Sequence, residues 1–456
     1  MQSNDNSKSV DIMLGNPKKA LISMSIPLII SLLISSLYNL IDAAWVSGLG
    51  ADALAGVGFF TPIFMILVGF GNGLGAGAAF AISKYIGEEN KPKADNASIH
   101  SILIDILVSI IITLIILVSL VPILNAMGVG QTIGFATDYG NIIVLGSIFI
   151  ILSNALYGIY RGEGDSRRPM YAMMASAILN MILDPIFIYT LNLGVKGAAI
   201  ATLISAVFVI LILTYWFYIK KDTYLRPTLS NFNFMRDISF DIVKVGFPAS
   251  IQLLNNAFFA AVFSALLTFV GSTDSVAVYS TGWRIVTIGT TPLLAIGTAL
   301  ISVIAANYGA KNYKNIQIVH RYSMKVSIVI AFAVAILTNV FASDIASIFT
   351  SSPGSARIAS ELTSFLAWIV IYYPTMAVGV NSTYVFQGIG KGITSMFQTI
   401  MRETGFTIFF AVLLGVYMGY GVWGAWMGIV LGEVVSNNIT MIWADWKIKK
   451  LMDIND

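Results

Sequence analysis

The stretch Leu179-Asn-Met-Ile-Leu-Asp-Pro185 places two polar side chains and a proline inside a long apolar segment, residues 170–191. Asn180 and Asp184 are four residues apart, so a helix would place both on one face. Pro185 has no N–H to donate, so the helix can bend directly after the carboxylate. An ionised aspartate at the centre of a membrane helix costs about 3 kcal/mol or more, which makes Asp184 a functional candidate.

A second carboxylate lies in another apolar run, Asn39-Leu-Ile-Asp-Ala-Ala-Trp45. Asp42 is therefore a functional candidate for the same physical reason. We expect the chain to be organised around these two acids.

The composition is that of an integral membrane protein. Of the 456 residues, 57% are hydrophobic and only 11% are charged, whereas soluble domains carry about 25% charged residues. The apolar runs exceed about 20 residues, which favours membrane helices over a β-barrel. The chain contains no cysteine, so disulfides and thiol chemistry are excluded. The net charge of +3 gives no indication of nucleic-acid binding.

Twelve apolar segments are long enough to cross a membrane, and they predict an all-α protein with twelve transmembrane helices. They run approximately over Ala20–Ser47, Ala53–Ser83, Ala97–Met127, Asn141–Tyr160, Met170–Leu191, Val195–Ile219, Ile242–Val270, Val276–Tyr308, Ile318–Phe349, Leu362–Phe386, Ile393–Met418 and Val422–Trp446. Prolines predict kinks in five of them. These are Pro27, Pro62, Pro248, Pro292 and Pro374.

The loop charges predict the orientation. Most of the 26 basic residues fall in loops on the side that holds both termini, whereas the opposite side has only Lys196 and Arg357. By the positive-inside rule, both termini are expected in the cytoplasm, with the chain crossing the plasma membrane many times. The expected organisation is a cytoplasmic tail, an N-terminal six-helix bundle, a cytoplasmic linker, a C-terminal six-helix bundle and a second tail. The corresponding ranges are 1–19, 20–219, 220–241, 242–446 and 447–456.

The two predicted bundles are copies of one another. Ile26-Pro27 matches Phe247-Pro248, and Leu193-Gly-Val-Lys-Gly-Ala198 matches Tyr420-Gly-Val-Trp-Gly-Ala425 at nearly the same offset. An even number of helices separates the copies, so both have the same orientation in the membrane. Such parallel repeats, related by an axis along the membrane normal, are typical of transporters.

Three groups of residues give the chain a family resemblance. Arg161-Gly-Glu-Gly-Asp165, Asn180 with Asp184-Pro185, and Tyr38-Asn39 with Asp42 resemble the multidrug and toxic compound extrusion (MATE) family, most closely its archaeal and DinF-like branch. The resemblance covers nearly the whole chain. It implies a V-shaped pair of six-helix bundles and export of organic, cationic or amphiphilic compounds by alternating access, driven by protons, sodium ions or both.

The resemblance also implies a cation site at Asp42, Asn180, Asp184 and Thr202. The sequence places Asp42, Asp184 and Thr202 six or seven residues from the outer ends of their helices, which corresponds to a common depth of about 10 Å. Oxygen-bearing side chains at one depth can bind a hard cation such as sodium. Two neighbouring carboxylates can instead share a proton. A third possibility is that the acids only form hydrogen bonds at a helix junction.

The substrate surface is expected on the first, fourth and fifth helices. Tyr38, Tyr139 and Asn154 are implied by the resemblance, and Met173 and Ser176 are added because they fall on the same helices. Methionine side chains repack easily and suit promiscuous binding.

Pro27 lies fifteen residues before Asp42, which is about 22 Å along a helix. We therefore expect Pro27 to act as a hinge. Our hypothesis is that loading the Asp42 site changes the bend of the first helix, shrinks the cavity of the N-terminal half and expels substrate.

Other ionisable residues lie in the predicted helices. Asp105 is expected near the cytoplasmic start of its helix, where it would face the lipid headgroups. Four further charges are expected to pair with one another in the C-terminal half as scaffolding, with a direct role in coupling as the alternative, namely Arg284, Arg402, Glu403 and Glu433. In the repeat, Asp184 corresponds to Phe410 and Thr202 to Ile429. The C-terminal half thus lacks the cation ligands, and coupling is expected in the N-terminal half alone.

No motif points to an enzyme. The chain has no phosphate-binding P-loop and no His-Glu-x-x-His, so neither ATP hydrolysis nor metalloprotease chemistry is expected. No cofactor is expected besides the coupling proton or sodium ion. The expected partners are small organic substrates and membrane lipids, with no nucleic acid, and we expect a monomer.

A flippase for lipids or lipid-linked precursors, of the same superfamily, is the second interpretation of the sequence. A membrane-embedded enzyme or receptor is the third.

Overall fold

The computed structural model describes residues 8–351 and 355–453, and within these residues the regular elements are all helices. Ten helices are individually long and apolar enough to span a membrane. Two further spans are helix pairs broken by a sharp bend, which brings the number to twelve. The prediction of an all-α membrane protein with twelve spans is confirmed.

The N-terminal half contains the first six spans and a short leading helix. Its elements are α1 (Lys8–Leu14), α2 (Pro17–Ser47), α3 (Ala51–Gly87), α4 (Lys91–Ala126), η1 (Gly130–Thr132), α5 (Ile133–Leu145), α6 (Ser147–Gly162), α7 (Arg167–Pro185), η2 (Ile186–Thr190), α8 (Val195–Tyr215) and η3 (Trp216–Lys220).

The C-terminal half repeats this order after a linker. Its elements are η4 (Leu229–Asn231), α9 (Arg236–Val270), α10 (Thr273–Gly309), α11 (Tyr313–Val340), α12 (Ala342–Phe349), η5 (Ala356–Ile358), α13 (Ala359–Ile369), α14 (Tyr372–Gly388), α15 (Gly392–Ile400), η6 (Met401–Phe406), α16 (Thr407–Val412), η7 (Leu413–Tyr417) and α17 (Gly421–Met452).

The fourth span of each half is broken. The helices 130–145 and 147–162 meet at 53°, and the helices 356–369 and 372–388 meet at 50°. The breaks fall at equivalent places of the repeat, and both spans begin earlier than predicted. Pro374 follows the second break, in the first turn of α14, where proline is tolerated. The first break has no proline; it falls at Gly146, where a Cβ atom would lie 2.3 Å from the Leu203 side chain.

Two of the expected loop segments are partly helical. Within the expected tail 1–19, α1 places Val10 and Met13 in the core, and Asn16 caps α2 by accepting bonds from the next backbone N–H groups. Within the expected linker 220–241, α9 already begins at Arg236. The parts of the tails at 1–7 and 454–456 lie outside the described residues.

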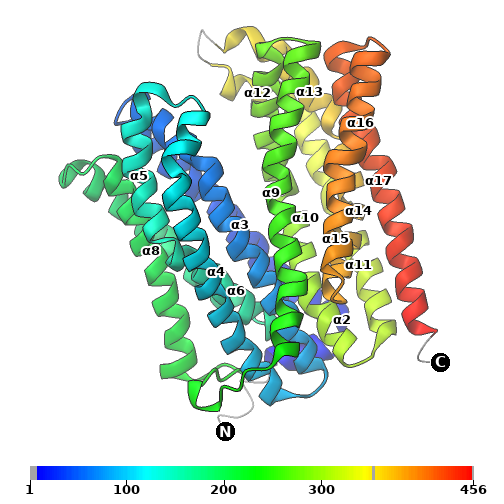
Figure 1. Cartoon of the computed structure of the whole chain (residues 1–456). Coiled ribbons are helices and arrows are strands. Elements are labelled where there is room, and N and C mark those ends of the chain that lie inside the picture. Colours follow the sequence, from blue (N-terminus) through cyan, green and yellow to red (C-terminus); the bar gives the residue numbers. More distant parts are fainter. Residues whose placement is uncertain (1–7, 352–354, 454–456) are drawn as a thin grey trace.

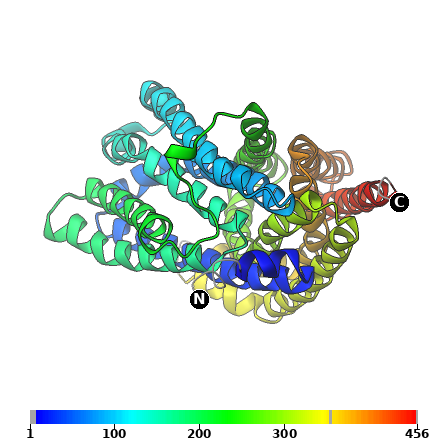
Figure 2. The ribbon, with the colours of Figure 1, turned by 90° about the horizontal axis from the view of Figure 1, so that it is seen from below.

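The two halves form a V. Figure 1 shows their helices close together at the end where the described chain begins and finishes, which we name the inner end, and apart at the opposite, outer end. Seen from the inner end, the halves lie side by side (Figure 2).

The hydrophobic core follows the same division. Toward the outer end, one buried cluster contains only N-terminal residues and another only C-terminal residues. The two remaining clusters combine both halves: Ile242 and Ala305 pack with α3 side chains, and Leu21 and Met24 pack with α10 side chains. Burial of apolar surface therefore holds the halves together at the inner end.

Candidate functional site

Asp42 and Asp184 meet in the folded protein. Asp42 is on α2 and Asp184 is on α7, and their carboxyl groups lie within hydrogen-bonding reach of each other. Asp184 is fully buried and Asp42 is half-buried. The Oδ1 atom of each has no hydrogen-bond partner among the described residues. Two carboxylates in contact and away from water cannot both carry an unpaired charge, so this pair is suited to share a proton or to hold a cation.

Asn180 and Thr202 complete this group. With its amide oriented to satisfy both neighbours, Asn180 donates to Asp184 Oδ2 at 2.7 Å and accepts from the Thr202 backbone N–H at 3.2 Å. The Thr202 hydroxyl donates to the Ala198 carbonyl at 3.0 Å, which leaves its oxygen lone pairs available. This set of oxygen donors, with two unpartnered Oδ1 atoms, fits a sodium ion as well as a proton.

Two of the expected substrate residues lie at the same place. The Tyr38 and Tyr139 hydroxyls are both within hydrogen-bonding reach of the Thr202 side chain, and both rings are close enough to Asp42 and Asp184 to interact with their charge. The structure thus brings together the four expected cation ligands and two aromatic side chains from α2 and α5.

A π-helix fixes the outer ends of the two acid-bearing helices. Directly after Pro185 the backbone widens into η2, and its Tyr189 hydroxyl donates to the Trp45 carbonyl of α2 at 2.5 Å. The rings of these two residues also meet, with centroids 6.2 Å apart. Gly48 leaves room for the contact, since a Cβ atom there would lie 2.2 Å from the Tyr189 hydroxyl. Sequence reasoning missed this tie, because aromatic residues are common at the ends of membrane helices.

The other expected substrate residues make different contacts. Asn154 donates to the Ile150 carbonyl of its own helix at 2.8 Å. The Ser176 hydroxyl donates to the Ser205 carbonyl at 2.9 Å and so joins α7 to α8. Met173 packs against the hydrophobic cluster at the inner end. Their contact with substrate stays a prediction.

Pro27 is buried inside α2, which is continuous across it. The neighbouring Met24 and Leu28 pack in the cluster that α2 shares with the C-terminal half. The Ser31 hydroxyl donates to the Pro27 carbonyl at 2.8 Å. The expected hinge is therefore located where α2 leaves its contact with the other half, and its bending stays a prediction.

The C-terminal half contains a charge cluster in which each acid has a partner. Arg402, in the π-helix η6, lies 2.7 Å from Glu403 and 3.8 Å from Glu433. Glu403 also accepts from Asn255 at 2.9 Å, and Glu433 accepts from Asn437 at 2.7 Å. The expected pairing of these three charges is confirmed.

Two other ionisable residues differ from expectation. Arg284 is exposed and forms no ion pair with any residue that the structure describes. Asp105 is buried, and neither of its carboxyl oxygens has a hydrogen-bond partner within the described residues. Its helix begins at Lys91, six residues earlier than predicted, so Asp105 lies deeper than the headgroup position expected for it.

Comparisons with known proteins agree with this architecture. The model of the MatE family matches residues 27–186 and 248–419, one block in each half. The multidrug export protein MepA of Staphylococcus saprophyticus is 28% identical over 407 residues, which are 87% of this chain and 85% of that protein.

Solved structures match along nearly the full length. An outward-facing multidrug resistance MATE transporter of the MOP superfamily is 37% identical, with a TM-score of 0.94, and the match covers 98% of this chain and 99% of that one. A MOP superfamily transporter from Pyrococcus furiosus is 37% identical, with a TM-score of 0.95 and the same coverage.

Proposed function

The chain belongs to the MATE family of multi-pass membrane transporters, and we propose that it exports organic, cationic or amphiphilic compounds in exchange for protons or sodium ions. Members of this family are transporters rather than enzymes. Similarity to MepA, which is named a multidrug exporter, supports drug efflux. The observation that carries cation coupling is the contact between the Asp42 and Asp184 carboxyl groups inside the helix bundle.

Exchange follows from competition for one pair of negative charges. A proton or sodium ion bound between Asp42 and Asp184 removes their mutual repulsion. An organic cation can neutralise the same charges, with the Tyr38 and Tyr139 rings offering π-faces that attract it. Loading the pair with the coupling ion then lowers the affinity for the organic cation and favours its release.

Alternating access is proposed to use α2. Because Asp42 and Pro27 are on this helix, a change of charge at Asp42 can alter its bend at Pro27 and the space beside Tyr38. The tie between Tyr189 and Trp45 keeps the outer end of α2 attached to α7 during that bend.

The placement in the cell follows the charge pattern. We place both termini in the cytoplasm and the chain in the plasma membrane, where it works as a monomer. A flippase for lipid-linked precursors is not favoured, because MepA and the 37% identical outward-facing transporter are both named for multidrug export or resistance.

The test is efflux of a fluorescent organic cation such as ethidium from proteoliposomes, with a pH gradient and a sodium gradient imposed separately. We expect Asp42→Asn and Asp184→Asn to reduce gradient-driven transport at least about 100-fold, because losing one of two interacting charges removes the ion site. Asp52→Asn is the matched control, since Asp52 is an exposed aspartate at the outer end of α3. Gradient-driven transport by Asp184→Asn at the wild-type rate would refute the proposal.

A further inference from the structure

A pocket of about 550 Å³ lies at the inner end, at the junction of the two halves. Four lysines line it, namely Lys84, Lys244, Lys311 and Lys391, and Glu88 is the one acidic side chain among the described residues of its lining. Lys84 and Glu88 belong to the N-terminal half, and the other three residues belong to the C-terminal half. The pocket therefore collects positive charge from separate parts of the chain.

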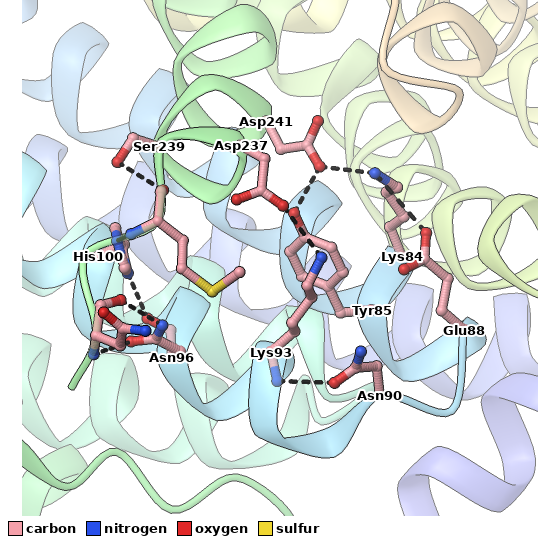
Figure 3. A network of polar contacts seen from close by, with 12 residues as sticks. Lys84, Tyr85, Glu88, Asn90, Lys93, Asn96, His100, Asp237, Ser239 and Asp241 are labelled. Carbon is pink, nitrogen blue, oxygen red and sulfur yellow. Dashed lines mark hydrogen bonds and ion pairs between the residues drawn. The ribbon is translucent and has the colours of Figure 1, made fainter. Parts of the chain in front are cut away.

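The acids near the pocket neutralise only part of this charge. Lys84 lies 2.7 Å from Asp241 and 3.8 Å from Glu88. Figure 3 shows the Lys84 ammonium group between these two acids. Lys244 forms an ion pair with the same Asp241, which also accepts a hydrogen bond from the Tyr85 hydroxyl at 2.8 Å. Asp241 and Glu88 thus face Lys84 and Lys244, whereas Lys391 forms no ion pair with any residue that the structure describes, so the pocket keeps an excess of positive charge.

The walls of the pocket require the halves to be in contact. A Cβ atom at Gly309 would lie 2.0 Å from the Lys84 carbonyl oxygen, and one at Gly87 would lie 1.9 Å from the Ala306 carbonyl oxygen. The end of α3 and the end of α10 therefore meet backbone to backbone beside the lysines. If the halves separated here, Lys84 would move away from Lys244, Lys311 and Lys391, and the pocket would cease to exist.

We propose that this pocket binds a phosphate-bearing anion and thereby stabilises the state in which the inner end is closed. Lysine ammonium groups are common phosphate ligands. Basic pockets between membrane helices on the cytoplasmic side bind anionic lipid headgroups. The positive-inside rule accounts for lysines scattered over cytoplasmic loops, but not for four of them converging from four segments on one concavity. The phosphate comes from an anionic phospholipid headgroup or from a soluble phosphate compound.

The test uses the purified full chain in phosphatidylcholine nanodiscs, with unfolding followed by tryptophan fluorescence. One arm adds phosphatidylglycerol to the bilayer and the other adds sodium pyrophosphate to the buffer. We expect at least one anion to raise the unfolding temperature by about 2–4 °C, because a ligand that binds only the folded state stabilises it. A response to phosphatidylglycerol assigns the site to lipid, and a response to pyrophosphate assigns it to a soluble phosphate.

Matched variants show whether the pocket is responsible. Lys311→Gln with Lys391→Gln should abolish the shift. Lys314→Gln with Lys325→Gln removes the same charge from exposed positions of the adjacent α11 and should keep it. Glu88→Gln removes an acidic side chain from the lining and should give a larger shift at the same anion concentration. Absence of a shift with both anions, or a normal shift in the first double variant, overturns the proposal.

A second measurement tests the closed inner end. The chain contains no cysteine, so spin labels can be attached directly to Tyr218→Cys in the N-terminal half and Lys449→Cys in the C-terminal half, both exposed near the inner end. The effective anion should increase the population with the shorter distance, and the Lys311→Gln, Lys391→Gln background should not respond. If the distance distribution is the same with and without the anion, the anion does not stabilise the closed state and this part of the proposal is wrong. Neither measurement depends on transport, so failure here is distinct from failure of the proposed export function.

Discussion

At the scale of single residues, the acids within the helices have different partners in the two halves. Glu403 and Glu433 share one arginine and accept hydrogen bonds from amide groups, so both carboxylates have partners within the protein. Asp42 and Asp184 have each other, and each has one oxygen without a hydrogen bond among the described residues. Partners of this kind suit a structural role, whereas a pair of acids without a basic partner is suited to take up the ion that we propose.

The first prediction separates these two roles. We expect Glu403→Gln and Glu433→Gln to lower the unfolding free energy by about 1–3 kcal/mol, because the buried Arg402 loses a partner. Export per folded molecule should fall only a few-fold, while Asp184→Asn should export nothing against a gradient. Efflux at matched protein levels checks this. An inactive Glu433→Gln beside an active Asp184→Asn would place coupling in the C-terminal half.

The second prediction concerns Glu163, which lies between the spans and is 1% exposed. Burial, together with the neighbouring Asp165, raises the pKa of Glu163 from 4.5 to about 8, although the Leu225 N–H donates to its carboxyl group at 3.0 Å. The folded protein therefore binds this proton more tightly than the unfolded chain does. The resulting stabilisation is complete below pH 4.5 and is lost as the pH rises through about 8.

The measurement is the unfolding temperature between pH 5 and pH 9. Wild-type protein should lose stability on the order of a few kcal/mol across this range through Glu163, and Glu163→Gln should remove that part of the slope. Glu89→Gln, at an exposed position of the loop between α3 and α4, is the control. If the unfolding temperatures of wild type and Glu163→Gln change with pH in parallel, Glu163 is not held in a buried, protonated state.

At the scale of elements, regular helical hydrogen bonding is interrupted near the proposed cation site and near the proposed hinge. In the span formed by α7 and η2, the π-helix follows Asp184 and Pro185 and carries the Tyr189 hydroxyl to α2. In α2, Pro27 leaves the Ser23 carbonyl without its usual backbone donor. Both features weaken regular helical hydrogen bonding near a place where helices contact one another.

The third prediction is that Pro27→Ala stiffens α2. The new N–H can bond to the Ser23 carbonyl, so the bend loses its weak point. Structures of wild-type protein at low and high pH, or with and without sodium, should differ in α2, and those of Pro27→Ala should not. Export should fall at least about 10-fold, since bending is required for release. Pro62→Ala, at an exposed proline of α3, should retain most activity. If α2 of the wild-type protein keeps the same bend when a proton or sodium ion binds near Asp42, the hinge prediction is wrong.

At the scale of the whole molecule, glycines set how closely the halves approach. Gly73, Gly77 and Gly87 of α3 each face backbone atoms of the C-terminal half at distances that leave no room for a Cβ atom. These contacts lie in the inner part of the V, where the mixed hydrophobic clusters also lie. Closing and opening the inner end therefore means making and breaking a backbone-to-backbone interface.

The fourth prediction is that Gly87→Ala disfavours the closed inner end. Its methyl group would overlap the Ala306 carbonyl, and backbone cannot move aside as a side chain can. Spin labels at Tyr218→Cys and Lys449→Cys should report a larger population with the longer distance. Gly134→Ala is the control, because nothing lies within 4 Å of a Cβ atom there. If the distance distribution between the spin labels is unchanged in Gly87→Ala, the interface accommodates the methyl group without opening, and the prediction is wrong.

Much of the fold follows from the sequence by itself. Hydrophobic length and loop charge are local properties, and they predicted the twelve spans and an orientation. The repeat predicted two equivalent bundles, and the spacing of Asn180 and Asp184 placed both on one face of a membrane helix. The desolvation cost of a charge in a membrane made Asp42 and Asp184 the candidates, and depth along a helix suggested that they lie at one level.

The tertiary structure alone decided which side chains meet. Asp105 and Glu433 are both acids in apolar helices, yet only Glu433 has an arginine and an amide beside it. The tie from Tyr189 to Trp45 and the convergence of Lys84 with Lys391 join residues far apart in the chain. Such contacts depend on the rotation, depth and breaks of each helix when it packs against its neighbours. Hydrophobic periodicity does not encode those quantities, because in a membrane helix the lipid-facing and the packed sides are both apolar.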